Sequence, residues 1–352
     1  MSMQTLSKLS GLLLSLLPLL VACNPEFDNR FSSVDAPRVL AVQSSPAEAA
    51  PNAGVSYRLL VVNQNGTLAN PRVDWSYCTK AKPINELNDV ASECFGEGDF
   101  VQPFASGPTA DGTLPKTACR QFGPDIPMTE AGQPPGRPTD PDSSGGFYQP
   151  LILSIRAGGE SISTLAETRI TCGLANGAGD IAAYRAATKV NENPALSAVT
   201  VTNLDNAVLS DGAVDGPLSV PASKKLTLSA SWPTCPTEPV CGDGMCTSGE
   251  TVADCPDDCT TPVGCTGSEA YGYIDPTTGL LVARHESMRV SWFATQGEFR
   301  DDHTGRTEEE AALASSDNEW TAPNTAGPVF MWVVLRDARG GISWQSFQLQ
   351  VD

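Results

Sequence analysis

Cysteine and acidic side chains, which form disulfides or bind metals, are concentrated between Cys235 and Cys265. Four cysteines lie inside this stretch, with four, eight and three residues between them: Cys241, Cys246, Cys255 and Cys259. Four cysteines so close together favour a disulfide knot, although they allow three pairings and the sequence does not choose between them. Since the strands on either side of the stretch must lie close together, we expect a flanking disulfide, Cys235–Cys265, to close it at its base.

Two metal sites are alternatives for the same stretch. A zinc site is disfavoured because the spacings are not those of paired CxxC motifs and because thiols outside the cytoplasm tend to oxidise. A calcium site would use four carboxylates, with backbone carbonyls and water completing a shell of six to eight oxygens. These carboxylates are Asp243, Glu250, Asp254 and Asp258. The simplest alternative is that they are solvated turn residues.

The first 23 residues are predicted to be an export signal. Lys8 precedes a twelve-residue apolar stretch over 9–20, which has the length of a signal-peptide core and is too short to span a bilayer. The stretch ends in Leu20-Val21-Ala22-Cys23, which resembles the lipobox of bacterial lipoproteins. The resemblance implies that residues 1–22 are removed and that acyl chains such as palmitate on Cys23 tether the protein to a membrane. The alternative is an ordinary cleaved signal in which Cys23 is incidental.

The number of cysteines supports lipidation. The chain has 11 cysteines, an odd number that requires an explanation in an exported protein. If Cys23 carries lipid, an even set of ten remains, and ten cysteines in an oxidising compartment indicate five disulfides. The ten are Cys78, Cys94, Cys119, Cys172, Cys235, Cys241, Cys246, Cys255, Cys259 and Cys265.

Charge and composition narrow the function classes. Because Lys8 leaves with the signal, the mature chain has 21 basic and 41 acidic residues and a net charge of −20. That charge opposes binding to nucleic acid. Gly (31) and Pro (28) punctuate short β-branched and aromatic runs in a chain of 352 residues, a pattern typical of β-sandwiches with many turns.

Two parts of the chain repeat one pattern of strands. An alternating strand at 55–61 is followed by a Val-x-Trp strand with Trp75, and the same pair recurs at 226–232 and around Trp292. Each copy ends with an apolar strand, a Gly-Gly turn and a closing strand. A tryptophan in the third strand resembles the immunoglobulin-like fold, in which it packs in the core. We therefore predict an all-β protein with two immunoglobulin-like sandwiches. In the last strand, 342–351, the apolar residues change phase, which predicts a β-bulge near Gln345 and Ser346.

The predicted sandwiches span 36–174 and 194–352, after a lipidated tether at 23–35. The linker between them, 175–193, is expected to hold one short helix near 181–187. Residues 102–150 are rich in Pro and Gly and are expected to form an irregular or disordered loop. The second sandwich is expected to carry the small disulfide-rich insertion, 235–265, between its second and third strands, and a solvated acidic loop at 300–320.

The cysteine-rich stretch also resembles a known module. Residues 241–259 follow the pattern C-G-D-G-x-C-x₂-G-E-x₄-C-P-x-D-C, which recurs in secreted and lipid-anchored proteins of myxobacteria and their relatives. The strands around Trp292 and at 332–346 are similar to the sandwich domains of myxobacterial surface lipoproteins. The resemblance implies location and architecture more than activity.

No catalytic signature is found in the sequence. The two histidines, His285 and His303, lack the spacing of the zinc-protease helix, and no hydrolase nucleophile elbow is present. We predict a non-enzymatic, lipid-anchored surface protein of the outer membrane, acting as a structural, adhesive or interaction module of the cell envelope. Its partners would be the membrane, through the lipid on Cys23, and other envelope proteins or glycans. The alternative is an accessory ligand-binding subunit of an extracellular degradative or transport system.

Overall fold

The computed structural model describes residues 31–352 except for 84–85, 88, 97, 125–141, 158, 175–182, 185–187, 206, 210–216, 236–240, 243–254, 259–263 and 276–277. The predicted signal and Cys23 lie outside this set. Ser32–Asp352 form one compact unit. None of the helices within the described ranges is long and apolar enough to cross a membrane.

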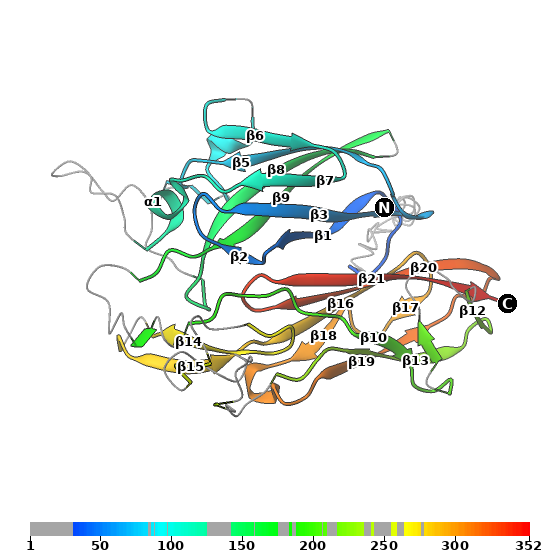
Figure 1. Ribbon diagram of the computed structural model, residues 1–352. Coiled ribbons are helices and arrows are strands. Elements are labelled where there is room, and N and C mark those ends of the chain that lie inside the picture. Colours follow the sequence, from blue (N-terminus) through cyan, green and yellow to red (C-terminus); the bar gives the residue numbers. More distant parts are fainter. Residues whose placement is uncertain are drawn as a thin grey trace, which may run out of the picture. The chain divides into compact units, whose positions relative to one another are not determined.

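The first sandwich packs two sheets against each other (Figure 1). One sheet holds β1 (Arg38–Ser45), β3 (Gly54–Asn63), β4 (Gly66–Thr67) and β7 (Thr109–Thr113). The other holds, in spatial order, β2 (Glu48–Ala49), β9 (Glu160–Ile170), β8 (Phe147–Ala157), β5 (Arg72–Cys78) and β6 (Val101–Ser106). Alternate residues of β3 (Val55, Tyr57, Val61) face Trp75 of β5 in the core, as strand periodicity requires.

The second sandwich has the same design. One sheet holds, in spatial order, β11 (Ala207–Leu209), β10 (Ala198–Val201), β13 (Lys225–Ser231), β19 (Ser315–Thr321) and β17 (Glu298–Phe299). The other holds β12 (Leu218–Val220), β21 (Ile342–Val351), β20 (Gly327–Asp337), β16 (Met288–Ala294) and β18 (His303–Arg306). A separate hairpin, β14 (Ala270–Ile274) and β15 (Leu281–His285), precedes β16.

The two sandwiches match strand for strand in the sheet that carries the tryptophan. In each, a short first strand pairs in parallel with the last strand (β2 with β9, β12 with β21), and the Val-x-Trp strand pairs with the first strand of the long closing hairpin. Trp75 and Trp292 are both fully buried, as predicted. The chain is therefore all-β with two immunoglobulin-like sandwiches, and the disulfide-rich insertion falls between β13 and β14.

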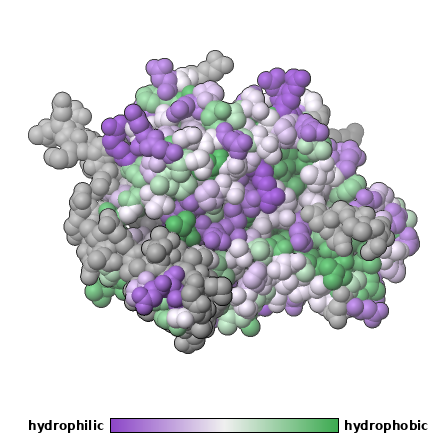
Figure 2. All heavy atoms as spheres, in the orientation of Figure 1, coloured by the Kyte–Doolittle hydropathy of each residue, from purple (hydrophilic) through white to green (hydrophobic). Residues whose placement is uncertain are grey.

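A third apolar cluster joins the two sandwiches. It lies between the outer face of the β1–β3 sheet and the outer face of the β16–β20–β21 sheet: Val34, Leu40, Ala41, Leu60, Val62, Phe293, Trp332 and Val334. Trp332 donates a hydrogen bond from Nε1 to Thr67 Oγ1 over 2.8 Å. On the face drawn in Figure 2, hydrophilic side chains gather where β1 and β21 approach each other. Between the sandwiches, Arg58 of β3 donates to Gln43 of β1 and lies 4.4 Å from the centre of the Trp344 ring of β21.

This cluster corrects the bulge predicted in the last strand. The pairing of β20 with β21 runs without a shift from Gly327↔Val351 to Arg336↔Ile342. Ile342 and Trp344 face the cluster between the sandwiches, whereas Phe347, Leu349 and Val351 face the core of the second sandwich. The change of phase therefore reflects burial of the two faces of one regular strand against different partners.

Two segments predicted as irregular loops contain regular structure. Residues 102–150 include most of β6, all of β7, α1 (Ala118–Phe122) and the start of β8; residues 125–141 lie outside the described set. The acidic segment 300–320 includes β18, the 3-10 helix η2 (Glu308–Glu310) and most of β19. Backbone pairing overrides local composition in both, because β7 pairs with β3 and β19 pairs with β13. The helix expected near 181–187 falls mainly outside the described residues. Residues 183–184 are described, and both are helical.

Candidate functional site

The cysteines within the described residues form four disulfides. The predicted Cys235–Cys265 bridge is one of them and closes the insertion at its base. Within the insertion, Cys241 pairs with Cys255. In the first sandwich, Cys78 at the end of β5 pairs with Cys94 of η1 (Ser92–Cys94), and Cys119 of α1 pairs with Cys172 after β9.

Most of the proposed calcium site lies outside the described residues. Among its proposed ligands, Asp243, Glu250 and Asp254 lie outside the described residues, as do Cys246 and Cys259. The fourth ligand, Asp258, accepts a hydrogen bond from the backbone N–H of Gly242. No group of three or more potential metal ligands occurs in the described part of the chain.

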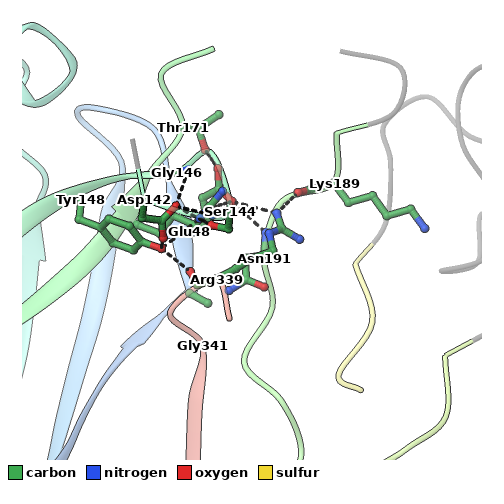
Figure 3. A network of polar contacts seen from close by, with 12 residues as sticks. Glu48, Asp142, Ser144, Gly146, Tyr148, Thr171, Lys189, Asn191, Arg339 and Gly341 are labelled. Atoms are coloured by element: carbon green, nitrogen blue, oxygen red, sulfur yellow. Dashed lines mark hydrogen bonds and ion pairs between the residues drawn. The ribbon is translucent and has the colours of Figure 1, made fainter. Parts of the chain in front are cut away.

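A buried ionic network, which sequence reasoning missed, connects the two sandwiches around Arg339 (Figure 3). Arg339 lies in the turn between β20 and β21 and is 1% exposed. Its guanidinium donates to Glu269 over 2.6 Å and to Glu286 over 3.4 Å, the two residues that flank the β14–β15 hairpin. It also donates to Glu48 of β2 over 3.4 Å and to the carbonyl of Lys189. The ring of Tyr271 lies 4.9 Å from its Cζ.

Glu48 extends the network into the first sandwich. Its carboxylate accepts hydrogen bonds from Arg169 Nε over 3.1 Å, from Thr171 Oγ1 over 3.0 Å and from the Asn191 N–H over 3.1 Å. Arg169 also donates to Ser144 Oγ over 2.7 Å. Since Glu48 meets Arg169 of the first sandwich and Arg339 of the second, it is the carboxylate that joins them.

Two carboxylates hold the loops around the network. Asp337, at the end of β20, accepts hydrogen bonds of 2.8 Å from the N–H groups of Arg339 and Gly341. A Cβ at Gly341 would lie 2.1 Å from Asp337 Oδ2, so the second glycine of the predicted Gly-Gly turn is required for this close approach. Asp142 accepts from Tyr148 Oη over 2.5 Å, and Tyr148 Oη also lies 3.2 Å from the Arg339 carbonyl.

Burial of the network, which holds more carboxylates than guanidinium groups, shifts the titration of these carboxylates. Burial raises the pKa of Glu269 to about 7, against the opposing attraction of Arg339. Burial, together with repulsion from Asp337 and Glu269, raises the pKa of Glu286 well above its usual range. Burial also raises the pKa of Asp337. Each of these shifts favours the protonated form of the carboxyl group, which relieves the excess of negative charge.

A groove of about 670 Å³ lies beside the β14–β15 hairpin. It is lined by both histidines of the chain and by three arginines: Arg284, His285, Arg289, His303 and Arg306. Arg284 is paired with Glu308 of η2 over 2.8 Å and donates to the Ser143 carbonyl over 2.7 Å. His303, expected in a solvated loop, lies in β18, and its Nδ1 is 3.1 Å from Ser291 Oγ. Burial lowers the pKa of His303, and Arg289 lowers it further.

Sequence reasoning missed these residues because they are close only in the folded chain. Arg339 and Glu48 are 291 residues apart in sequence, and Arg339 and Glu286 are 53 apart. The Gly340-Gly341 turn was a local signal for the position of Arg339, but nothing nearby indicates its carboxylate partners. The ionic network around Arg339 joins strands, loops and the β14–β15 hairpin in a buried position. The groove lies next to the network and is open to solvent.

Comparison with known proteins reveals remote structural likeness only. No protein-family model matches the chain, and no curated protein matches its sequence. The native α2-macroglobulin of Escherichia coli is 9% identical with a TM-score of 0.22; the match covers 92% of this chain but 17% of that one. A chimeric titin Z1Z2 tandem is 9% identical with a TM-score of 0.20, over 90% of this chain and 99% of that one. The Yersinia pseudotuberculosis adhesin InvE is 10% identical with a TM-score of 0.19, over 88% and 58%. Similarities this low support no conclusion about function.

Proposed function

We propose that the chain is a non-enzymatic, lipid-anchored interaction module of the cell envelope. The observation that carries this proposal is the junction between the sandwiches, where a shared apolar cluster lies beside the ionic network around Arg339. Two sandwiches joined by a buried interface behave as one rigid body, because separating them would expose both apolar surface and buried charge. A rigid body on a membrane tether holds its loops at a fixed distance from one another, which suits adhesion or assembly with envelope partners.

The tether is the part of the proposal that rests on sequence. Acyl chains on Cys23 would hold the module on the membrane, since membrane affinity grows by about 0.8 kcal/mol for each buried methylene. The strongly acidic character of the chain, −19 in total, disfavours attraction to anionic headgroups and leaves the lipid as the main source of membrane binding.

Fractionation of cells that express the native chain or Cys23→Ser tests the anchor. We expect the native chain in the detergent phase and the Cys23→Ser chain either in the aqueous phase or retained as an uncleaved precursor in the inner membrane. Equal recovery of a processed Cys23→Ser chain from the outer membrane contradicts lipid anchoring.

The interaction role is tested separately by photo-crosslinking on intact cells. A crosslinker is placed at an exposed position of the native chain, such as Val208 or Leu313. Discrete crosslinked species containing another envelope component support the module. Turnover of a substrate by the purified chain, with no crosslinked species at any exposed position, contradicts it.

A further inference from the structure

Four side chains that can contact an anion lie together on the outer face of the sheet that carries Trp292. In the pairing of β16 with β20, Arg289 is directly opposite Arg336. In the pairing of β16 with β18, Ser291 is directly opposite His303. Since Arg289 and Ser291 are two residues apart on one strand, all four side chains are on the same face. That face is the continuation of the one covered by the first sandwich at Phe293, Trp332 and Val334.

Hydrogen bonds hold three of the four in place. Arg336 donates from Nη1 to Ser291 Oγ over 3.2 Å and from Nη2 to the Leu40 carbonyl over 2.6 Å. Ser291 Oγ also lies 3.1 Å from His303 Nδ1. The side chain of Arg289 is exposed and makes no hydrogen bond or ion pair within the described parts of the chain. The Arg336 guanidinium is therefore held in place on the same face as Arg289, and neither arginine is paired with a carboxylate among the described residues.

The concentration of positive charge is unfavourable for the folded protein unless an anion is bound. Like charges directly opposite each other in a sheet destabilise the pairing. Burial lowers the pKa of Arg336 to about 10, and the charge of Arg289 contributes to the shift. Both arginines also oppose protonation of His303, while Asp302 favours it. Asp302 already accepts a hydrogen bond of 3.0 Å from the Ser32 N–H.

We propose that Arg289 and Arg336, positioned by Ser291 and flanked by His303, form a binding site for a phosphate or sulfate group at the edge of the groove. Arg289 and Arg336 are directly opposite each other on neighbouring strands, and the several oxygens of a tetrahedral oxyanion can accept from two guanidinium groups at once. The site deepens the proposed interaction function by naming the ligand chemistry, and it rests on that function for its biological role. A phosphate or sulfate ester of an envelope component would place the same group in the site as the free ion.

Titration calorimetry with the lipidated chain in detergent micelles tests the site, using inorganic phosphate, sulfate, glycerol phosphate and acetate in turn. We expect saturable binding of phosphate and sulfate and weaker binding of acetate. Arg289→Gln is expected to lower phosphate affinity about tenfold, the loss of one charge-assisted hydrogen bond. Arg156→Gln, the same change at an exposed position on the first sandwich, is the matched control and should leave affinity unchanged. Retained affinity for glycerol phosphate indicates an ester as the ligand, and loss of it indicates the free ion.

A second readout uses the histidines, of which the chain has two. Bound phosphate should raise the pKa of His303 relative to the phosphate-free protein in NMR titrations, because the anion offsets Arg289 and Arg336. His285→Gln assigns the two resonances. The site is overturned by absence of saturable phosphate binding, by acetate binding as tightly as phosphate, or by unchanged affinity in a folded Arg289→Gln chain. None of these results bears on lipid anchoring or on crosslinking to partners, so failure of the site is distinguishable from failure of the module.

Discussion

At the scale of single residues, Arg339 is the side chain on which the junction depends most. Arg339→Ala leaves Glu48, Glu269 and Glu286 buried without their shared cation. We expect the free energy of unfolding to fall by about 3–5 kcal/mol at pH 8, as is found when one partner of a buried ion pair is removed. Chemical denaturation measures the change.

The same substitution at an exposed ion pair provides the comparison. Arg156 lies 3.8 Å from Asp74, and both side chains are more than half exposed. Arg156→Ala should therefore cost at most about 1 kcal/mol. Equal losses for Arg156→Ala and Arg339→Ala would show that burial does not set the strength of the network.

The proton held by Glu269 predicts how stability depends on pH. The folded chain keeps this proton up to about pH 7, whereas the unfolded chain releases it near its ordinary value of 4.5. Between these values the folded state binds more protons, so the contribution is complete below pH 4.5 and is lost as the pH rises through 7. One such group gives a slope of at most about 1.4 kcal/mol per pH unit, and Glu286 acts in the same direction.

Glu269→Gln isolates this effect because the amide stays neutral at every pH. The decline in thermal midpoint between pH 5 and 8 should become shallower in Glu269→Gln and stay as in the native chain in Glu160→Gln, an exposed carboxylate of β9. A midpoint that rises across this range in the native chain, or an unchanged slope in Glu269→Gln, contradicts the assignment.

At the scale of elements, β20 and β21 contribute side chains both to the core of the second sandwich and to the apolar cluster between the sandwiches. One hydrogen bond of β20 can be used to measure the energetic coupling between the two sandwiches. Trp332 of β20 donates to Thr67 of β4 over 2.8 Å. A double-mutant cycle with Thr67→Val and Trp332→Phe should give a coupling of about 0.5–1.5 kcal/mol in the free energy of unfolding. Replacing Thr67 by Val and Trp292 by Phe is the control pair, because Trp292 bonds within its own sandwich to Thr304. Coupling near zero for Thr67 and Trp332 would mean that this hydrogen bond does not stabilise the junction between the sandwiches.

The same elements show what the sequence could and could not predict. Strand periodicity and the Val-x-Trp motif correctly predicted the fold class and the burial of Trp75 and Trp292, since both depend on local alternation. The β-bulge predicted in the last strand was wrong because alternation does not reveal that the outer face of β21 is also covered. Local sequence patterns did not predict the ionic network, because Arg339 and its partner Glu48 are 291 residues apart in the sequence. Composition likewise misassigned the segments of β7 and β19, whose partners lie elsewhere in the chain.

At the scale of the whole molecule, the pairing of the cysteines relates the architecture of the protein to the cellular compartment in which it folds. In the part of the chain that the structure describes, eight cysteines form four disulfides, which lie in the first sandwich and in the insertion. If Cys23 carries lipid, two of the 11 cysteines remain, Cys246 and Cys259. An exported chain in an oxidising compartment leaves few thiols free, so we expect these two to pair with each other.

Alkylation of the unfolded, unreduced mature protein, followed by mass spectrometry, tests this pairing. The exported chain should take up no alkylating agent and should yield a linked peptide pair containing Cys246 and Cys259, whereas the same chain made without its signal in a reducing cytoplasm should be alkylated at the ten cysteines after Cys23. Replacing Cys235 and Cys265 together by Ser should cost about 3–4 kcal/mol, because their bridge closes a loop with a sequence separation of 30. Four alkylated thiols in the insertion of the exported chain, with zinc released by mild acid, would replace the disulfide knot by a metal site.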